Sequence, residues 1–218
     1  PASLGYSYYW ANIGDMVNQG VEASLSAIAV QSKDITWTIS GNISANHNRI
    51  TKLPDDRRQI DVNGHLGYSS GNFIYAEGMP LHSWYIRQYG GVADSGVPMW
   101  VTSREDADLD AAGNPLVNAA GEYVTTTYSK GGFYDCGSAL PVAYGGLSTS
   151  LQAYGFDLAL QFNYSIGGKK LDYGYKSLMG APSSGYTGYN IHRDALLGCS
   201  EYNTDYSIPR SQYGATET

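Results

Sequence analysis

Apolar and polar residues alternate along residues 35–46, and this two-residue period is the strongest pattern in the chain. Side chains of a β-strand point alternately to opposite faces, so the pattern predicts a strand with one apolar and one polar face. Residues 21–29 alternate in the same way, and the short break at residues 32–34 predicts a hairpin. The apolar positions are Val21, Ala23, Leu25, Ala27 and Ala29 in the first strand and Ile35, Trp37, Ile39, Ile43 and Ala45 in the second.

A second hairpin is predicted around the dipeptide Tyr154-Gly155. Residues 147–153 and 156–165 alternate as the first pair does, and the dipeptide between them is short enough for a tight turn. The apolar positions are Leu147, Leu151, Ala153, Phe156, Leu158, Leu160, Phe162 and Tyr164.

The length of these segments leaves two all-β architectures open, a soluble β-sandwich and a transmembrane β-barrel. The segments run for about 10–14 residues, whereas strands of soluble sheets average ~5–6 and a tilted strand that crosses a bilayer needs ~9–11. The connections favour the barrel. Tight turns contrast with one long polar excursion from about Tyr89 to Gly137, and outer-membrane barrels have short turns on one rim and long extracellular loops on the other.

Composition and charge exclude several functional classes. The 218 residues include 20 Tyr and 27 Gly, and only 15% of them are charged. Gly and aromatic residues disfavour helix interiors, so we expect no long helices. The net charge of -7 argues against nucleic acid as a partner, because phosphate binding needs clustered Lys and Arg. No run approaches the roughly 18 apolar residues of a membrane-spanning helix. A membrane role would therefore rest on strands.

Three groups of residues follow one another in a recognisable order. The first is Asn12-Ile13-Gly14-Asp15-Met16-Val17-Asn18-Gln19-Gly20-Val21-Glu22, with the Trp37 strand and Asn46-His47-Asn48-Arg49-Ile50 after it. The second is Glu77-Gly78-Met79-Pro80, Trp84-Tyr85, Gly90-Gly91-Val92 and Gly96-Val97-Pro98-Met99-Trp100. The third is Gly137-Ser138-Ala139-Leu140-Pro141, Gly145-Gly146-Leu147, Phe156-Asp157-Leu158 and Gly167-Gly168-Lys169. Together they resemble the later part of the barrel in the SusC/RagA group of TonB-dependent outer-membrane transporters.

This resemblance implies a fold, a location and partners. Residues 1–218 would be part of the β-barrel domain of a TonB-dependent receptor in the cell outer membrane, an antiparallel all-β segment without the plug domain and the final strands. Such barrels have about 22 strands, of which this chain would supply about eight. The implied function is import of oligosaccharides or peptides with a SusD-like surface lipoprotein and with energy from TonB. The alternative is a soluble extracellular β-sandwich module that binds carbohydrate.

A barrel wall would divide the strand residues between lumen and outer-membrane lipid. Trp37 would lie in the lipid or near its interface. We expect polar residues to face the lumen and apolar residues the lipid, namely Thr38, Ser40, Asn42, Gln152 and Gln161 on one side and Ile39, Leu158 and Leu160 on the other.

Ligand contacts are expected near the long excursion, at Trp84, Tyr85, Arg87 and Trp100. Rings there could stack on sugar faces while Arg87 and Gln88 donate hydrogen bonds. The competing interpretation is that Tyr and Trp form girdles at the membrane interfaces, which we favour for most Tyr residues.

Other chemistry has weaker support in the sequence. Asp106, Asp108 and Asp110 are spaced as in a calcium loop, but an acidic solvated turn is the commoner outcome, so no metal and no cofactor is expected. Cys136 and Cys199 could form a disulfide in an oxidising compartment. The chain has neither a nucleophile elbow nor a phosphate-binding glycine loop, so we expect no enzyme activity.

Overall fold

The computed structural model describes residues 14–179, 190–198, 200 and 207–210. The chain divides into two compact units, Pro1–Trp84 with Gly137–Lys169, and Tyr85–Cys136 with Lys170–Thr218. None of the helices in the described part of the chain combines the length and the apolar character needed to cross a membrane.

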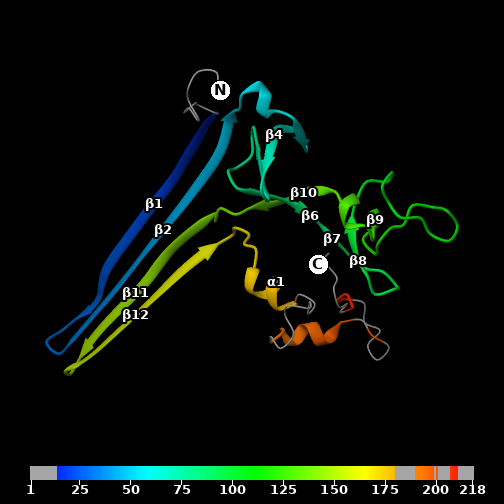
Figure 1. The fold of residues 1–218 in the computed structure, drawn as a ribbon. Helices are drawn as coiled ribbons and strands as arrows, with labels where there is room; N and C mark the ends of the chain where they lie inside the picture. Colours follow the sequence, from blue (N-terminus) through cyan, green and yellow to red (C-terminus); the bar gives the residue numbers. More distant parts are fainter. Residues whose placement is uncertain (1–13, 180–189, 199, 201–206, 211–218) are drawn as a thin grey trace, which may run out of the picture. The chain divides into compact units, whose positions relative to one another are not determined.

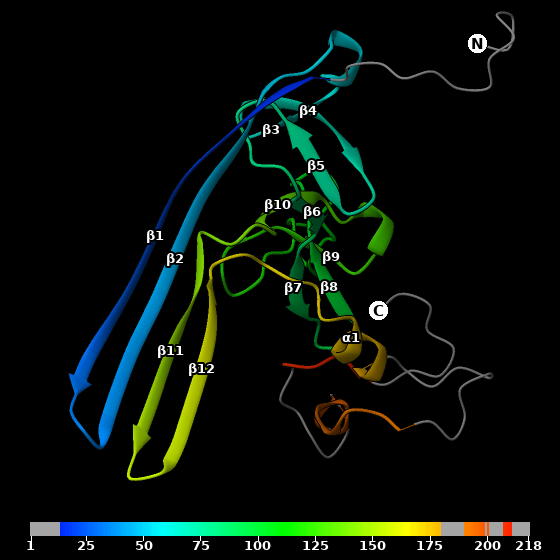
Figure 2. The same cartoon turned by 90° about the vertical axis from the view of Figure 1, so that its left-hand side faces the viewer.

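Four long strands of the first unit form one antiparallel sheet, in the order β1-β2-β11-β12. They are β1 (Asp15–Gln31), β2 (Ile35–Lys52), β11 (Ala143–Ala153) and β12 (Phe156–Ile166), and they run side by side (Figure 1; Figure 2). Both predicted hairpins are confirmed, and each strand extends beyond its predicted range, by one residue in β12 and by eight in β1. The pairing of β2 with β11 joins segments that are far apart in the sequence.

The chain between β2 and β11 folds into two smaller sheets. One has the order β10-β6-β5-β4-β3, and the other has the order β7-β8-β9. The strands are β3 (Ile60–Val62), β4 (His65–Ser70), β5 (Phe73–Ala76), β6 (Ser83–Arg87), β7 (Tyr89–Val92), β8 (Pro98–Val101), β9 (Val124–Thr125) and β10 (Phe133–Ser138). Helix α1 (Tyr173–Met179) and the 3-10 turns Asp55–Arg57, Tyr128–Lys130 and Arg193–Leu197 complete the described elements.

Two details of the sequence prediction are wrong. The excursion between the long strands begins at Leu53 and ends at Val142, so it is longer than the predicted segment from Tyr89 to Gly137. The described residues contain four long strands rather than about eight. The short strands between β2 and β11 have two to six residues, and they pair with one another around small cores instead of extending the long sheet.

The register of the long sheet separates a polar face from an apolar face. Directly opposed residues of paired strands lie on the same face, and Ser40 is opposite Ser148, which is in turn opposite Gln161. On the other face Ile39 is opposite Thr149, and Thr149 is opposite Leu160. The same register places all the expected lumen residues on one face and all the expected lipid residues on the other, which are Thr38, Ser40, Asn42, Gln152 and Gln161, and Ile39, Leu158 and Leu160.

The apolar face is largely uncovered within the described residues. Leu25 is 75% exposed, Phe162 is 58% exposed and Leu158 is 52% exposed. An apolar patch of this kind is unfavourable in water, and monomeric soluble proteins rarely expose one over a few hundred Å². At ~3.3 Å per residue and a tilt near ~45°, the 11 residues of β11 would cross roughly 26 Å, close to the ~25 Å apolar band of outer-membrane barrels.

The two hairpin turns lie at the same end of the sheet (Figure 2), where the Tyr154 N–H donates to the Asp34 carbonyl at 3.0 Å. Tyr154 and Gly155 have φ values of 50° and 84°, as a two-residue type I′ turn requires. Within the described residues the long connection between β2 and β11 therefore leaves from the opposite end of the sheet, and the predicted contrast between short and long connections is confirmed.

The residues Glu77-Gly78-Met79-Pro80 hold the start of the excursion against the end of β2. Ile50 N–H donates to the Met79 carbonyl at 2.9 Å, and Gly78 N–H donates to the Ile50 carbonyl at 2.8 Å. Glu77 Oε1 accepts a 2.7 Å hydrogen bond from the N–H of buried Leu53 and forms a 3.1 Å ion pair with Arg58. We call this set of contacts the Glu77 clamp.

Replacement of Glu77 by Ala tests the Glu77 clamp. The Leu53 N–H would lose its acceptor in a buried position, which should lower the local opening free energy by about 1–3 kcal/mol. Hydrogen exchange of the segment 50–58 measures this. Asp55→Ala is the matched control, because Asp55 also pairs with Arg58 but its side chain is 96% exposed, so little change is expected. Equal effects of the two variants would contradict the assignment.

Candidate functional site

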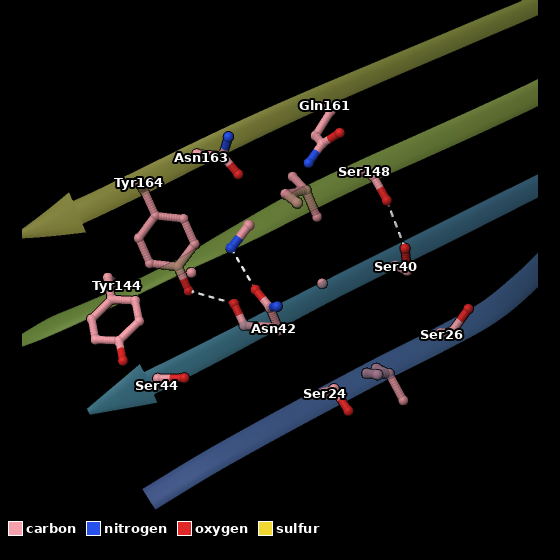
Figure 3. Close-up of a pocket in the computed structure, with 15 residues that line it drawn as sticks. Ser24, Ser26, Ser40, Asn42, Ser44, Tyr144, Ser148, Gln161, Asn163 and Tyr164 are labelled. Atoms are coloured by element: carbon pink, nitrogen blue, oxygen red, sulfur yellow. Dashed lines mark hydrogen bonds between the residues drawn. The ribbon is translucent and has the colours of Figure 1, made fainter. Parts of the chain in front are cut away.

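A shallow groove of about 630 Å³ follows the polar face of the long sheet (Figure 3). Its polar lining consists of hydroxyl and amide groups and contains no charged side chain. The lining residues labelled in Figure 3 are Ser24, Ser26, Ser40, Asn42, Ser44, Tyr144, Ser148, Gln161, Asn163 and Tyr164. This surface can exchange hydrogen bonds with water or a polar solute but has no group for acid–base or nucleophilic chemistry.

Hydrogen bonds between side chains and neighbouring strands fix this groove. The hydroxyls of Ser40 and Ser148 are 2.6 Å apart, and the Asn42 side-chain oxygen accepts from the Gly146 N–H. On the opposite face, where it is paired with Gly145, Tyr164 donates its hydroxyl to the Asn42 carbonyl at 2.9 Å. A Cβ at Gly145 would collide with that carbonyl and with the Tyr164 hydroxyl, so this position needs glycine.

A second candidate site lies in the other unit, around Arg87. Its guanidinium carbon is 4.3 Å from the ring centroid of Tyr128 and 4.3 Å from that of Phe133. Tyr85 stacks on Phe133 with centroids 5.5 Å apart, and Trp100 meets Tyr128 edge to face at 5.0 Å. We call these five residues the Arg87 cluster.

The Arg87 cluster contains three of the four expected ligand contacts, and the fourth lies in the other unit. Trp84 donates its indole N–H to the Lys169 carbonyl at 2.8 Å, and its ring packs on that of Phe73 with the ring centroids 4.5 Å apart. Gln88 is also engaged, because its amide donates to Glu122 at 3.1 Å. Tyr128 and Phe133 were not among the expected residues, and only their aromatic character marks them in the sequence.

The turn that carries Tyr128 is tied to β8. Thr102 donates its hydroxyl to the Lys130 carbonyl at 2.6 Å, and Gly132 N–H donates to the Val101 carbonyl at 2.9 Å. Gly131 lies so close to Trp100 and Arg87 that a Cβ there would be 2.9 Å from the Trp100 Cβ. These contacts fix the ring of Tyr128 relative to Arg87.

The three aspartates of the acidic loop each have a different local role. Asp108 accepts from the Thr125 hydroxyl and from both the N–H and the hydroxyl of Thr126. Asp110 accepts from the N–H groups of Ala112 and Asn114, and Asp106 accepts from Ser103. Within the described residues no group of three or more His, Cys, Asp or Glu side chains could hold a metal ion.

The electrostatics of Asp108 follow from these contacts. Burial raises the pKa of the Asp108 carboxyl, but the hydrogen bonds from Thr126 and Thr125 and the charge of Lys130 outweigh burial, so the pKa lies below its ordinary value. Asp108 therefore stabilises the loop above the ordinary carboxyl pKa, and this stabilisation is lost as the pH falls through the lowered pKa.

The possible disulfide stays a prediction. Cys136 is half-buried, and Cys199 lies outside the described residues.

Known proteins resemble this chain in both sequence and structure. No family model matches it. TonB-dependent receptor P3 of Formosa agariphila is 30% identical over 212 residues, which covers 96% of this chain and 20% of that receptor. TonB-dependent receptor SusC of Bacteroides thetaiotaomicron is 27% identical over 220 residues, covering 93% of this chain and 20% of SusC. A solved structure of the RagAB peptide transporter aligns with a TM-score of 0.70 and 25% identity, over 97% of this chain and 22% of that chain.

Along nearly its whole length the chain is similar to TonB-dependent receptors of the SusC/RagA type. It spans about a fifth of the length of the curated relatives P3 and SusC. A second RagAB structure, in the open-open state, aligns with a TM-score of 0.71 over the whole chain at 23% identity, which supports the fold. Receptors of this type are β-barrels of the outer membrane, and the long sheet is a piece of such a wall.

Replacement of Leu160 by Arg tests which face of the long sheet contacts lipid. Arg at the bilayer midplane costs about 2–4 kcal/mol, so the intact receptor should assemble poorly in the outer membrane. Gln161→Arg is the matched control, because Gln161 is the next residue of β12 and lies on the opposite face. Heat-modifiable migration of the assembled barrel measures the outcome. Normal assembly of the Leu160 variant would contradict the lipid assignment.

Replacement of Asp108 by Ala tests the loop assignment. Three hydrogen bonds to the carboxylate disappear, so the opening free energy of residues 124–127 should fall by about 1–3 kcal/mol at neutral pH, as measured by hydrogen exchange. The difference from the parent should shrink as the pH is lowered through the carboxyl range. Asp106→Ala, which removes one contact with Ser103, should change little. A calcium-dependent change in the parent would instead indicate a metal loop.

Proposed function

We propose that the intact protein imports oligosaccharides or peptides across the outer membrane, with a SusD-like surface lipoprotein as partner and with energy from TonB. The observation that carries this proposal is the match to TonB-dependent receptors along nearly the whole chain, joined to a sheet with one polar and one uncovered apolar face. The relatives are named as receptors and transporters, and we propose no catalytic role for this chain.

In this proposal residues 1–218 form part of a barrel domain whose plug and final strands lie elsewhere in the protein. Strands β1 and β12 are the edges of the long sheet, and each pairs on one side only within the described residues. Unpaired strand edges favour association with further strands, and in lipid every backbone hydrogen-bonding group needs a partner. Neighbouring strands of the barrel would provide them.

The two candidate sites then have different roles. The hydroxyl and amide groups of the groove line the lumen, where they interact with water, plug or passing solute. Tyr85, Arg87 and Trp100 of the Arg87 cluster lie in the excursion, which is extracellular in this proposal, and contact the ligand there. For Trp84 we propose a ligand contact through the exposed part of its ring only, since its indole N–H is already bonded.

The soluble β-sandwich is the weaker alternative. A sandwich would cover the apolar face of the long sheet with a second sheet, whereas Leu25 and Phe162 of that face are largely exposed in the described structure.

Uptake measurements in the native host test the proposed transport. Deletion of the gene should abolish import of the fluorescently labelled glycan or peptide that the parent strain takes up, and deletion of TonB should have the same effect. The intact receptor, purified through an affinity tag, should retain a surface lipoprotein. Unchanged uptake in both deletion strains would contradict the proposal.

A further inference from the structure

We propose that Arg87 is a binding site for a carboxylate group of the ligand. The site is built from the Arg87 guanidinium and the rings of Tyr128 and Phe133. The inference rests on the transport function proposed above and narrows the ligand to a molecule with a carboxylate, either a peptide C-terminus or a uronic acid unit.

The Arg87 guanidinium is held in place by its own surroundings. It lies 4.3 Å from each of the two ring centroids, and its Nε donates to the Gly131 carbonyl at 3.1 Å. Cation–π contacts of this kind replace water on the faces of the guanidinium. The side chain is half-buried and its orientation is already fixed. Ligand binding at Arg87 therefore costs little conformational entropy.

The donors that remain on Arg87 are its two terminal amino groups. In the described part of the chain, neither has a recorded hydrogen-bond partner, and no carboxylate lies within ion-pair distance of Arg87. Glu122, the carboxylate that influences neighbouring Tyr134, already accepts from Gln88 and Asn118. The positive charge of Arg87 is therefore uncompensated within this part of the chain.

The chemistry of these donors favours a carboxylate over a sugar hydroxyl. A guanidinium presents parallel N–H groups that match the two oxygens of a carboxylate, and such charge-assisted pairs are stronger than neutral hydrogen bonds. A hydroxyl would match only one donor and would leave the charge unpaired. Tyr128 and Phe133 are 37% and 45% exposed, so the cluster is open to a ligand on its outer side.

Binding measurements on the purified intact receptor test this proposal. One arm compares a pool of random tetrapeptides with free C-termini against the same pool amidated. The other arm compares oligogalacturonate with neutral oligogalactan. In one arm the acidic probe should bind about ten- to hundredfold more tightly than its neutral counterpart, the ratio expected from charge-assisted hydrogen bonds. The arm that shows the preference identifies the source of the carboxylate.

Arg87→Gln should abolish this preference, because it should weaken binding of the acidic probe far more than binding of the neutral probe. Arg57→Gln is the matched control, because Arg57 also lies over a ring, that of Tyr68 at 5.1 Å, and should not affect the preference. Hydrogen exchange of the Gly132 amide reports whether the turn stays closed. If Arg87→Gln opens the turn, Arg87→Lys is used instead, since it keeps the charge but loses the paired donors, and it should weaken the preference at least threefold.

Three results would overturn the proposal: no acid preference in either arm, a preference that survives in the folded Arg87 variants, or an equal loss of acidic and neutral binding. The last result would show that Arg87 only holds the loop together. Uptake in cells tests the transport function separately, so TonB-dependent uptake without an acid preference would reject the Arg87 site alone.

Discussion

The register between β2 and β11 is the constraint on which the rest of the structure depends. A slip of one residue would move every side chain of β11 to the opposite face and put Ser148 among the apolar residues. Contacts on both faces oppose such a slip, because Ser40 meets Ser148 on the polar face and Trp37 donates to Thr149 at 2.7 Å on the apolar face. In lipid every backbone N–H and carbonyl group must also have a hydrogen-bond partner. The strand pairing and the face on which each side chain lies are therefore fixed together.

The same register explains how two strands that are adjacent in the sheet can be joined by a long excursion of the chain. β2 and β11 are held by their own backbone bonds, so the chain between Leu53 and Val142 is free to carry small sheets with separate cores. The Glu77 clamp secures the first of these segments to β2, and the turn at Gly131 fixes the rings near Arg87. Ligand chemistry can therefore vary in the excursion without any change in the wall.

The long strands could be predicted from sequence because their patterns are local. The candidate ligand site could not be predicted in full, because its contacts join residues that are far apart in the chain. The hairpins around residues 32–34 and Tyr154-Gly155 follow from alternation and turn residues that are adjacent in the chain. The contacts of Arg87 with Tyr128 and Phe133 join residues more than 40 positions apart, which no periodicity reveals. The spacing of Asp106, Asp108 and Asp110 indicated one shared site, whereas the loop geometry gives each carboxylate its own donors.

Cysteine labelling along β11 and β12 of the intact receptor in native membranes tests the central claim most directly. In a background with Cys136 and Cys199 replaced by serine, single cysteines at 148, 150, 161 and 163 should react with a water-soluble maleimide. Those at 147, 151, 158 and 160 should be protected from it and should react with a lipid-soluble reagent. A two-residue alternation with this phase confirms the wall, and uniform labelling of both sets or the opposite phase would contradict it.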